Sequence, residues 1–158
     1  MPAFPSRPTR RGSLATALAL GSLLALGAAS ARAGEAPRLL PPGDPDRKAM
    51  LDVLRPALET ELSGPVEFVV KAARTQGHWG HVHVEPQRPG GGAIDLARTT
   101  FADQAEMMDG LTTDALFQKR GDRWYLITHV VGPTDAAASN WTISGVPLSL
   151  LTGRAEDE

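Results

Sequence analysis

The chain has 158 residues, 42% of them hydrophobic, and a formal net charge of −2. It contains no cysteine, which excludes a disulfide framework, a lipid-anchored N-terminal cysteine, a thiol nucleophile and a thiolate metal site. An apolar core alone must hold the protein together, and the hydrophobic content is sufficient for one.

The first 33 residues have the pattern of a secretory signal peptide. Arg10 and Arg11 belong to a positively charged start, residues 14–28 are apolar and uncharged, and Ala31 and Ala33 are the small residues before a cleavage site. The apolar run is shorter than the roughly 20 residues that a bilayer requires. We therefore expect a bacterial protein that is periplasmic or secreted and has no membrane span after cleavage near Ala33. The paired arginines also partly resemble a twin-arginine signal, which is the alternative export route.

Removal of residues 1–33 takes away four arginines and no acid, and it leaves 12 basic against 18 acidic residues. This excess of acid argues against non-specific binding to nucleic acid or to anionic membranes. The remaining length is enough for one domain. We expect an extended arm at 34–43, an α+β domain at 44–135 and a C-terminal extension at 136–158 with a frayed acidic end.

Residues 45–62 have the apolar spacing of one amphipathic helix. Asp44 is a good N-cap and Pro45 suits the first helical position. Gly64 and the proline after it end the segment. The apolar side of this helix is expected to consist of leucines at Leu51, Leu54, Leu58 and Leu62.

Four strands are expected after this helix, arranged as two hairpins. A long insertion separates the hairpins, with a short helix possible at 102–108. A helix followed by antiparallel strands is typical of the α+β class, in which the helix covers one sheet face and leaves the other partly open. Apolar residues after 135, Trp141 among them, are expected to pack back on the domain. The expected strands cover 66–72, 78–84, 113–119 and 124–131.

The second expected strand carries the best candidate chemistry. Because strand side chains alternate, His81 and His83 share one side, together with Trp79. Neutral imidazole suits zinc, copper or nickel, so these two residues and His78 are weak candidate metal ligands. A histidine-rich solvent-facing side is the simpler interpretation, and we expect no tight metal site. A further ligand would have to come from elsewhere in space, with three candidates: Glu85, Asp95 and His129.

Other motifs in the chain point less clearly to chemistry. Three glycines at 90–92 lack the Lys-Ser or Lys-Thr of a phosphate loop, and no Gly-x-Ser-x-Gly elbow is present. Trp79, Trp124 and Trp141 are expected to anchor the core. With Met107 and Met108 they are also a candidate lining of a small apolar pocket beneath the insertion. Carboxylates in the insertion are typical of a solvated loop: Asp95, Asp103, Glu106 and Asp109.

Several short runs of this sequence resemble a group of short exported bacterial proteins of uncharacterised function. At the level of architecture, the chain is similar to the cystatin-like or nuclear-transport-factor-like roll, in which a helix packs on a curved antiparallel sheet. Such folds host binders, enzymes and accessory domains, so the resemblance implies no activity and no site residues. His81 and His83 are not part of the shared pattern. The runs that carry the resemblance are 42–48, 64–70, 86–89, 123–126 and 132–135.

These observations lead to one functional hypothesis and two alternatives. We expect an exported, non-catalytic binding or accessory domain that needs no cofactor and binds an envelope protein or a small ligand. The insertion at 90–110 is long for a connection in a small domain, which favours it as part of the contact surface. The alternatives are a small enzyme with a pocket between helix and sheet, and a periplasmic metal binder through His81 and His83. The candidate ligand-binding residues are Trp79, His81, His83, Met107 and Met108.

The signal-peptide interpretation predicts that the exported chain begins at Gly34. Intact-mass analysis of protein from the envelope fraction should give the mass of residues 34–158, and replacing Ala33 with a bulky residue should block processing. A mass that retains the first 33 residues would contradict the prediction.

Overall fold

The computed structural model describes residues 35–108, 110–132, 140–142 and 144–154. All of them belong to one compact unit, Ala31–Glu158. The predicted signal peptide, the expected domain boundary at 135–136 and the acidic end at 155–158 lie outside the described residues. Asp109, one of the carboxylates of the insertion, also lies outside them.

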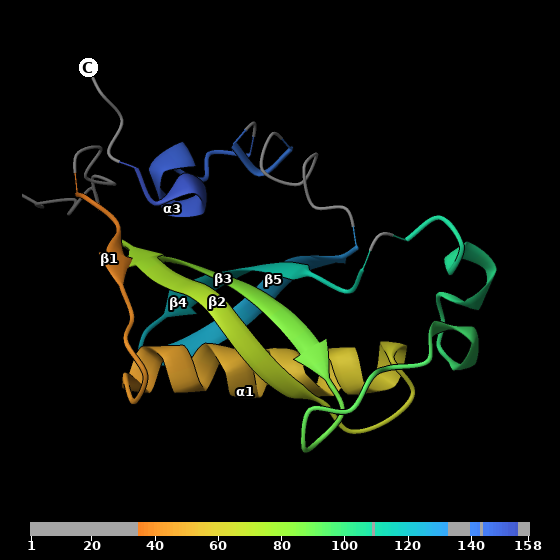
Figure 1. The fold of residues 1–158 in the computed structure, drawn as a ribbon. Coiled ribbons are helices and arrows are strands. Elements are labelled where there is room, and N and C mark those ends of the chain that lie inside the picture. The colour runs from red at the N-terminus through yellow and green to blue at the C-terminus, as the bar shows by residue number, and fades with distance from the viewer. Residues whose placement is uncertain (1–34, 109, 133–139, 143, 155–158) are drawn as a thin grey trace, which may run out of the picture. The chain divides into compact units, whose positions relative to one another are not determined.

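The described residues form a five-stranded antiparallel sheet with a helix, which confirms the α+β class. The strands lie in the order β1-β2-β3-β4-β5 (Figure 1). The prediction of four strands and an N-terminal helix was incomplete, because Arg38 and Leu39 of the expected arm pair with Thr75 and Arg74 and precede the helix as a strand. The elements are β1 (Arg38–Leu39), α1 (Pro45–Glu61), β2 (Glu67–Gln76), β3 (Trp79–Gln87), β4 (Thr113–Arg120), β5 (Arg123–Val131) and α3 (Leu148–Thr152).

Helix α1 begins at the cap that the sequence indicates. The Asp44 carboxylate accepts a hydrogen bond from the backbone N–H of Asp46 at 2.9 Å, and Pro45 occupies the first turn. The Asp46 carboxylate in turn accepts from Lys119 Nζ at 2.9 Å and from Trp124 Nε1 at 2.8 Å. These bonds join the first turn of α1 to the β4–β5 hairpin. Burial disfavours the charged form of Asp46, but the two bonds and the nearby cations outweigh it and lower the pKa of that carboxyl.

One side of α1 packs against the sheet and supplies the centre of the core. Met50, Leu54 and Leu58 on this side are fully buried, and Leu62 just after the helix is buried with them. Leu51, which was expected on the same side, is only partly buried. Among the described residues, no helix is long and apolar enough to cross a membrane. The sheet contributes alternate residues to this core: Ala73, Val82, Val84, Ala115, Phe117 and Trp124.

A second, smaller apolar cluster lies on the other sheet face. The described residues at 140–142 and 144–154 are called the C-terminal segment. Leu116 of β4 contacts three of them, Trp141, Val146 and Leu150, and all four side chains are buried. Figure 1 shows α1 on one side of the sheet and α3 on the other. The sequence analysis expected apolar residues of this region to pack back on the domain, and the described ones do so, although Leu148 stays half-exposed.

The insertion between β3 and β4 contains two 3₁₀ turns, Leu96–Arg98 and Ala102–Gln104, instead of one helix at 102–108. Asp95 caps the first turn by accepting from the backbone N–H of Ala97. The chain returns to α1 where Thr100 donates from its backbone N–H to the carbonyl of Glu61 at 3.0 Å.

The burial of Leu54 predicts how much the free energy of unfolding falls when its side chain is shortened. Leu54→Ala should lower the free energy of unfolding by about 2–5 kcal/mol, the range for a fully buried leucine. Urea unfolding followed by circular dichroism measures the change. Val53→Ala is the matched control, because Val53 is on the same helix but 37% exposed, and it should alter stability by no more than about 0.5 kcal/mol. Equal effects of the two variants would contradict this orientation of α1.

Candidate functional site

The histidines of β3 lie on the sheet face that α1 does not cover. Val82 and Val84 are fully buried in the core beneath α1. Because side chains alternate along a strand, His81 and His83 must point to the opposite face. Both residues therefore lie on one side of the strand, as the sequence predicts.

Asp114 of β4 joins the two histidines into one cluster. Its position follows from the strand register, in which His83 lies opposite Asp114 and His81 lies opposite Leu116. His81 Nε2 and His83 Nδ1 each lie 2.8 Å from the same oxygen, Asp114 Oδ1. One carboxylate oxygen therefore binds both imidazoles, and we call these three residues the His-Asp-His cluster.

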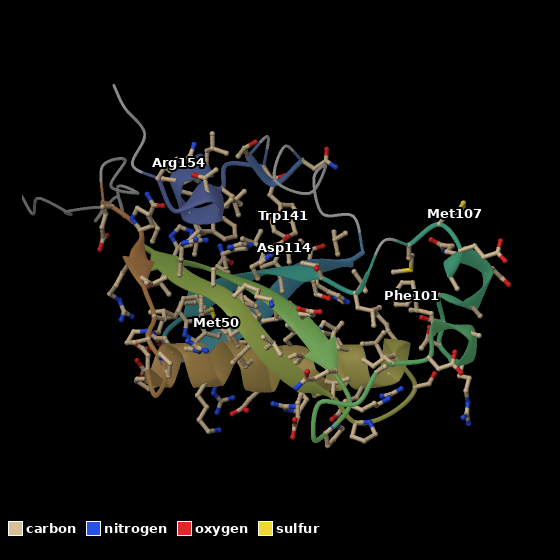
Figure 2. All side chains as sticks on the ribbon, in the orientation of Figure 1. Met50, Phe101, Met107, Asp114, Trp141 and Arg154 are labelled. Carbon is tan, nitrogen blue, oxygen red and sulfur yellow. The ribbon has the colours of Figure 1, made fainter. Side chains whose placement is uncertain are left out.

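The His-Asp-His cluster is buried at one end and open at the other. The side chain of His81 is 4% exposed and that of Asp114 is 13% exposed, whereas that of His83 is 34% exposed. Trp141 of the C-terminal segment lies over the buried end, with its ring centroid 6.2 Å from that of His81 and a T-shaped arrangement. Figure 2 shows Trp141 directed from this segment toward the sheet at Asp114. Solvent therefore reaches the cluster from the side of His83.

Polar contacts hold the C-terminal segment on this sheet face. Arg74 of β2 donates to the backbone carbonyl of Leu151 at 3.3 Å, and the Ser149 hydroxyl donates to Gln76 Oε1 at 2.9 Å. The guanidinium of Arg74 occupies the space beside Gly153, where a Cβ atom would lie 2.7 Å from Arg74 Nε. Gly153 also ends α3 in the left-handed conformation, φ 73°, so this position favours glycine twice over.

The chemistry of the cluster follows from the ionisation of Asp114. Burial raises the pKa of this carboxyl, but hydrogen bonds and charge from His81 and His83 outweigh burial, so the pKa lies below its ordinary value. An ionised carboxylate only accepts hydrogen bonds, so His81 Nε2 and His83 Nδ1 both carry hydrogen. In the neutral rings, the remaining nitrogens are acceptors. Among the described residues, His81 Nδ1 is buried and has no hydrogen-bond partner.

The other candidate residues from the sequence lie in different places. Trp79 is partly buried against the second apolar cluster, on the same face as His81. His78 is exposed in the β2–β3 turn, where its ring lies 5.0 Å from that of Trp79. Met107 is 74% exposed and points away from the sheet (Figure 2). Met108 lies against Gly132 at the end of β5.

The three residues considered as a further metal ligand all have other partners. His129 Nε2 bonds Glu61 of α1 at 2.9 Å, and Glu85 pairs with Lys71 at 3.0 Å. Asp95 caps a 3₁₀ turn. Within the part of the chain that the structure describes, no group of three or more histidine or acidic side chains has the geometry of a metal site.

Backbone N–H groups of the glycine loop at 90–92 already donate hydrogen bonds to other residues of the protein. Gly90 N–H donates to Glu67 Oε2 at 3.1 Å, and Gly91 N–H donates to the Arg88 carbonyl at 3.0 Å. An open depression of about 370 Å³ lies beside this loop, between the end of β3 and Leu111. Neither Met107 nor Met108 lines it.

Comparisons with protein-family models, with curated proteins and with solved structures found no match to this chain.

Asp114 is the site residue that the sequence analysis missed. Its signal was present, because Asp114 is a carboxylate within the expected strand at 113–119 and alternates with the apolar Ala115. What the sequence lacked was the register between β3 and β4, which are separated by a long insertion. Without that register, nothing selected Asp114 over the carboxylates of the insertion.

The lowered pKa of Asp114 predicts how stability depends on pH. A carboxyl whose pKa is lower in the folded chain stabilises the fold above the unfolded pKa of about 3.9, and this contribution is lost as the pH falls through the folded pKa. At pH 7, Asp114→Asn should therefore lower the free energy of unfolding by roughly 1.5–3 kcal/mol. Urea unfolding should show the difference from wild type shrinking below about pH 4.

The control for this experiment is Asp122→Asn, which removes an exposed carboxylate in the β4–β5 turn. It should have little effect at any pH. A stability difference for Asp114→Asn that is the same at pH 7 and pH 3 would contradict an ionised, hydrogen-bonded Asp114.

Proposed function

We propose that this protein is an exported, non-catalytic binding domain whose ligand site is the His-Asp-His cluster and the adjoining surface of Trp141. The observation that carries the proposal is Asp114 Oδ1, which fixes two imidazoles at 2.8 Å each beneath an aromatic side chain. Polar groups held in place before a ligand arrives lose little conformational freedom on binding. A few fixed polar groups beside aromatic surface are typical of small-molecule sites.

Several features support a ligand rather than a purely structural role for the cluster. Burial of a charged carboxylate is costly. Apolar side chains at these positions would stabilise this sheet face without that cost. His83 keeps the cluster in contact with solvent, with a third of its side chain exposed. His81 Nδ1 remains a buried acceptor without a partner among the described residues, and unpaired buried polar atoms are frequent at functional sites.

An enzyme is the alternative, and one observation favours it. His83 bonds Asp114 through Nδ1, which leaves its Nε2 without a partner among the described residues, and a third of the side chain is exposed. This is the orientation in which a carboxylate holds a histidine for general-base catalysis. However, the two bonds that define the cluster each join an imidazole to Asp114. A nucleophile held by the base, which catalysis of this kind requires, has no counterpart in these contacts.

A fragment screen by two-dimensional NMR of the purified protein tests the proposal. Amide shifts caused by binding fragments should concentrate on β3, β4 and residues 140–142, and they should weaken in His83→Gln. Met107→Gln is the matched control, because Met107 is exposed in the insertion, and it should leave binding unchanged.

Two outcomes would overturn the proposed function. Shifts confined to the insertion at 90–110 and lost in Met107→Gln would move the binding surface to that segment. A turnover signal in a broad substrate screen, abolished by His83→Gln while the fold stays intact, would favour the enzyme.

A further inference from the structure

We propose that the His-Asp-His cluster recognises the ammonium group of an alkylamine. This inference rests on the proposed function and names the class of ligand for that site. Three features of the site point to this group: the hydrogen-bonding character of the cluster, its charge and the aromatic surface beside it.

The cluster offers acceptors and no free donors in its hydrogen-bonded state. Both N–H groups are directed to Asp114 Oδ1. The two other ring nitrogens, His81 Nδ1 and His83 Nε2, then carry lone pairs. A second proton on His81 would place an N–H donor at a buried atom that has no partner among the described residues, which is costly. The ligand that fits such a site must itself donate hydrogen bonds.

The charge of the cluster favours a cation among the possible donors. Asp114 is ionised, and among the described residues its ion pairs are with the two imidazoles alone. Whenever neither ring is protonated, the cluster carries one negative charge, and the attraction that Asp114 exerts on a protonated ring acts equally on an ammonium group. An ammonium group provides three N–H donors and a positive charge in the volume of one small group.

The aromatic surface supplies a place for the alkyl part of the ligand. Trp79, two residues before His81 on the same strand face, is only partly buried and offers this surface, whereas Trp141 is buried over His81. Tryptophan attracts alkylammonium groups through its ring face. The open side at His83 is the entry, so the ring of His83 meets the ligand first, whereas His81 Nδ1 is buried.

Titration with three ligands of similar size tests the inference. The probes are butylammonium, butanol and butyrate, added to the purified protein at pH 7.5 and followed by two-dimensional NMR. Butylammonium should shift β3, β4 and the Trp141 indole signal with millimolar affinity, and Asp114→Asn should weaken its binding by about tenfold or more. His83→Gln should weaken binding without removing the carboxylate. Asp122→Asn removes the same charge at a distance and should leave binding unchanged.

A fourth probe distinguishes two sources of the same group. N-acetyl-lysine methylamide carries a primary ammonium on a peptide backbone. Tighter binding of this compound than of butylammonium would support the inference and assign the site to a lysine of a partner protein. Equal or weaker binding would support a free amine.

The failures of the inference and of the proposed function have different signatures. Shifts of the same residues by butanol or butyrate, with none from butylammonium, would overturn the ammonium assignment and leave the binding site in place. If no probe shifts these residues, and the fragment screen also fails to shift them, both proposals are overturned. An equal response to butylammonium in wild type and Asp114→Asn would overturn the ammonium assignment alone.

Discussion

The packing of α1 against one face of the sheet determines where chemistry is possible in this protein. Met50, Leu54 and Leu58 fill that face together with Phe117, and burial of these side chains is the main favourable term in folding. Because strand side chains alternate, each residue that enters this core sends its neighbours to the other face. The His-Asp-His cluster therefore lies opposite α1 as a direct consequence of the apolar pattern.

The attachment of α1 is also polar, and it is made at the start of the helix. Asp46 accepts hydrogen bonds from Lys119 and Trp124, so the β4–β5 hairpin is joined to the first turn. Arg38 of β1 donates to Asp44 and Asp46 as well. At the other end, Arg88 donates to the carbonyl of Leu62 at 2.6 Å, where the helix leaves acceptors unpaired. Side chains from three strands bind the start of α1, and Arg88, just after β3, binds its end, which together fix the position of the helix relative to the sheet.

Apolar side chains of the C-terminal segment bury part of the sheet face that carries the His-Asp-His cluster. Without Trp141, Val146 and Leu150, the cluster would be a solvated polar patch, in which hydrogen bonds contribute little. With them, His81 and Asp114 are largely withdrawn from water, and a lower local dielectric strengthens their interaction. Hydrogen bonds from Arg74 to Leu151 and from Ser149 to Gln76 hold the segment in this position.

The sequence by itself determined the local elements and the sides on which their residues lie. The cap at Asp44, the four-residue spacing of Leu54 and Leu58, and the alternation around His81 and His83 are local signals, and local backbone geometry is sufficient to interpret them. Tertiary structure alone decided that Arg38 and Leu39 form a fifth strand, that Asp114 meets both histidines and that Trp141 covers them. These contacts join residues far apart in the chain, and their register depends on packing across a long insertion that no local pattern encodes.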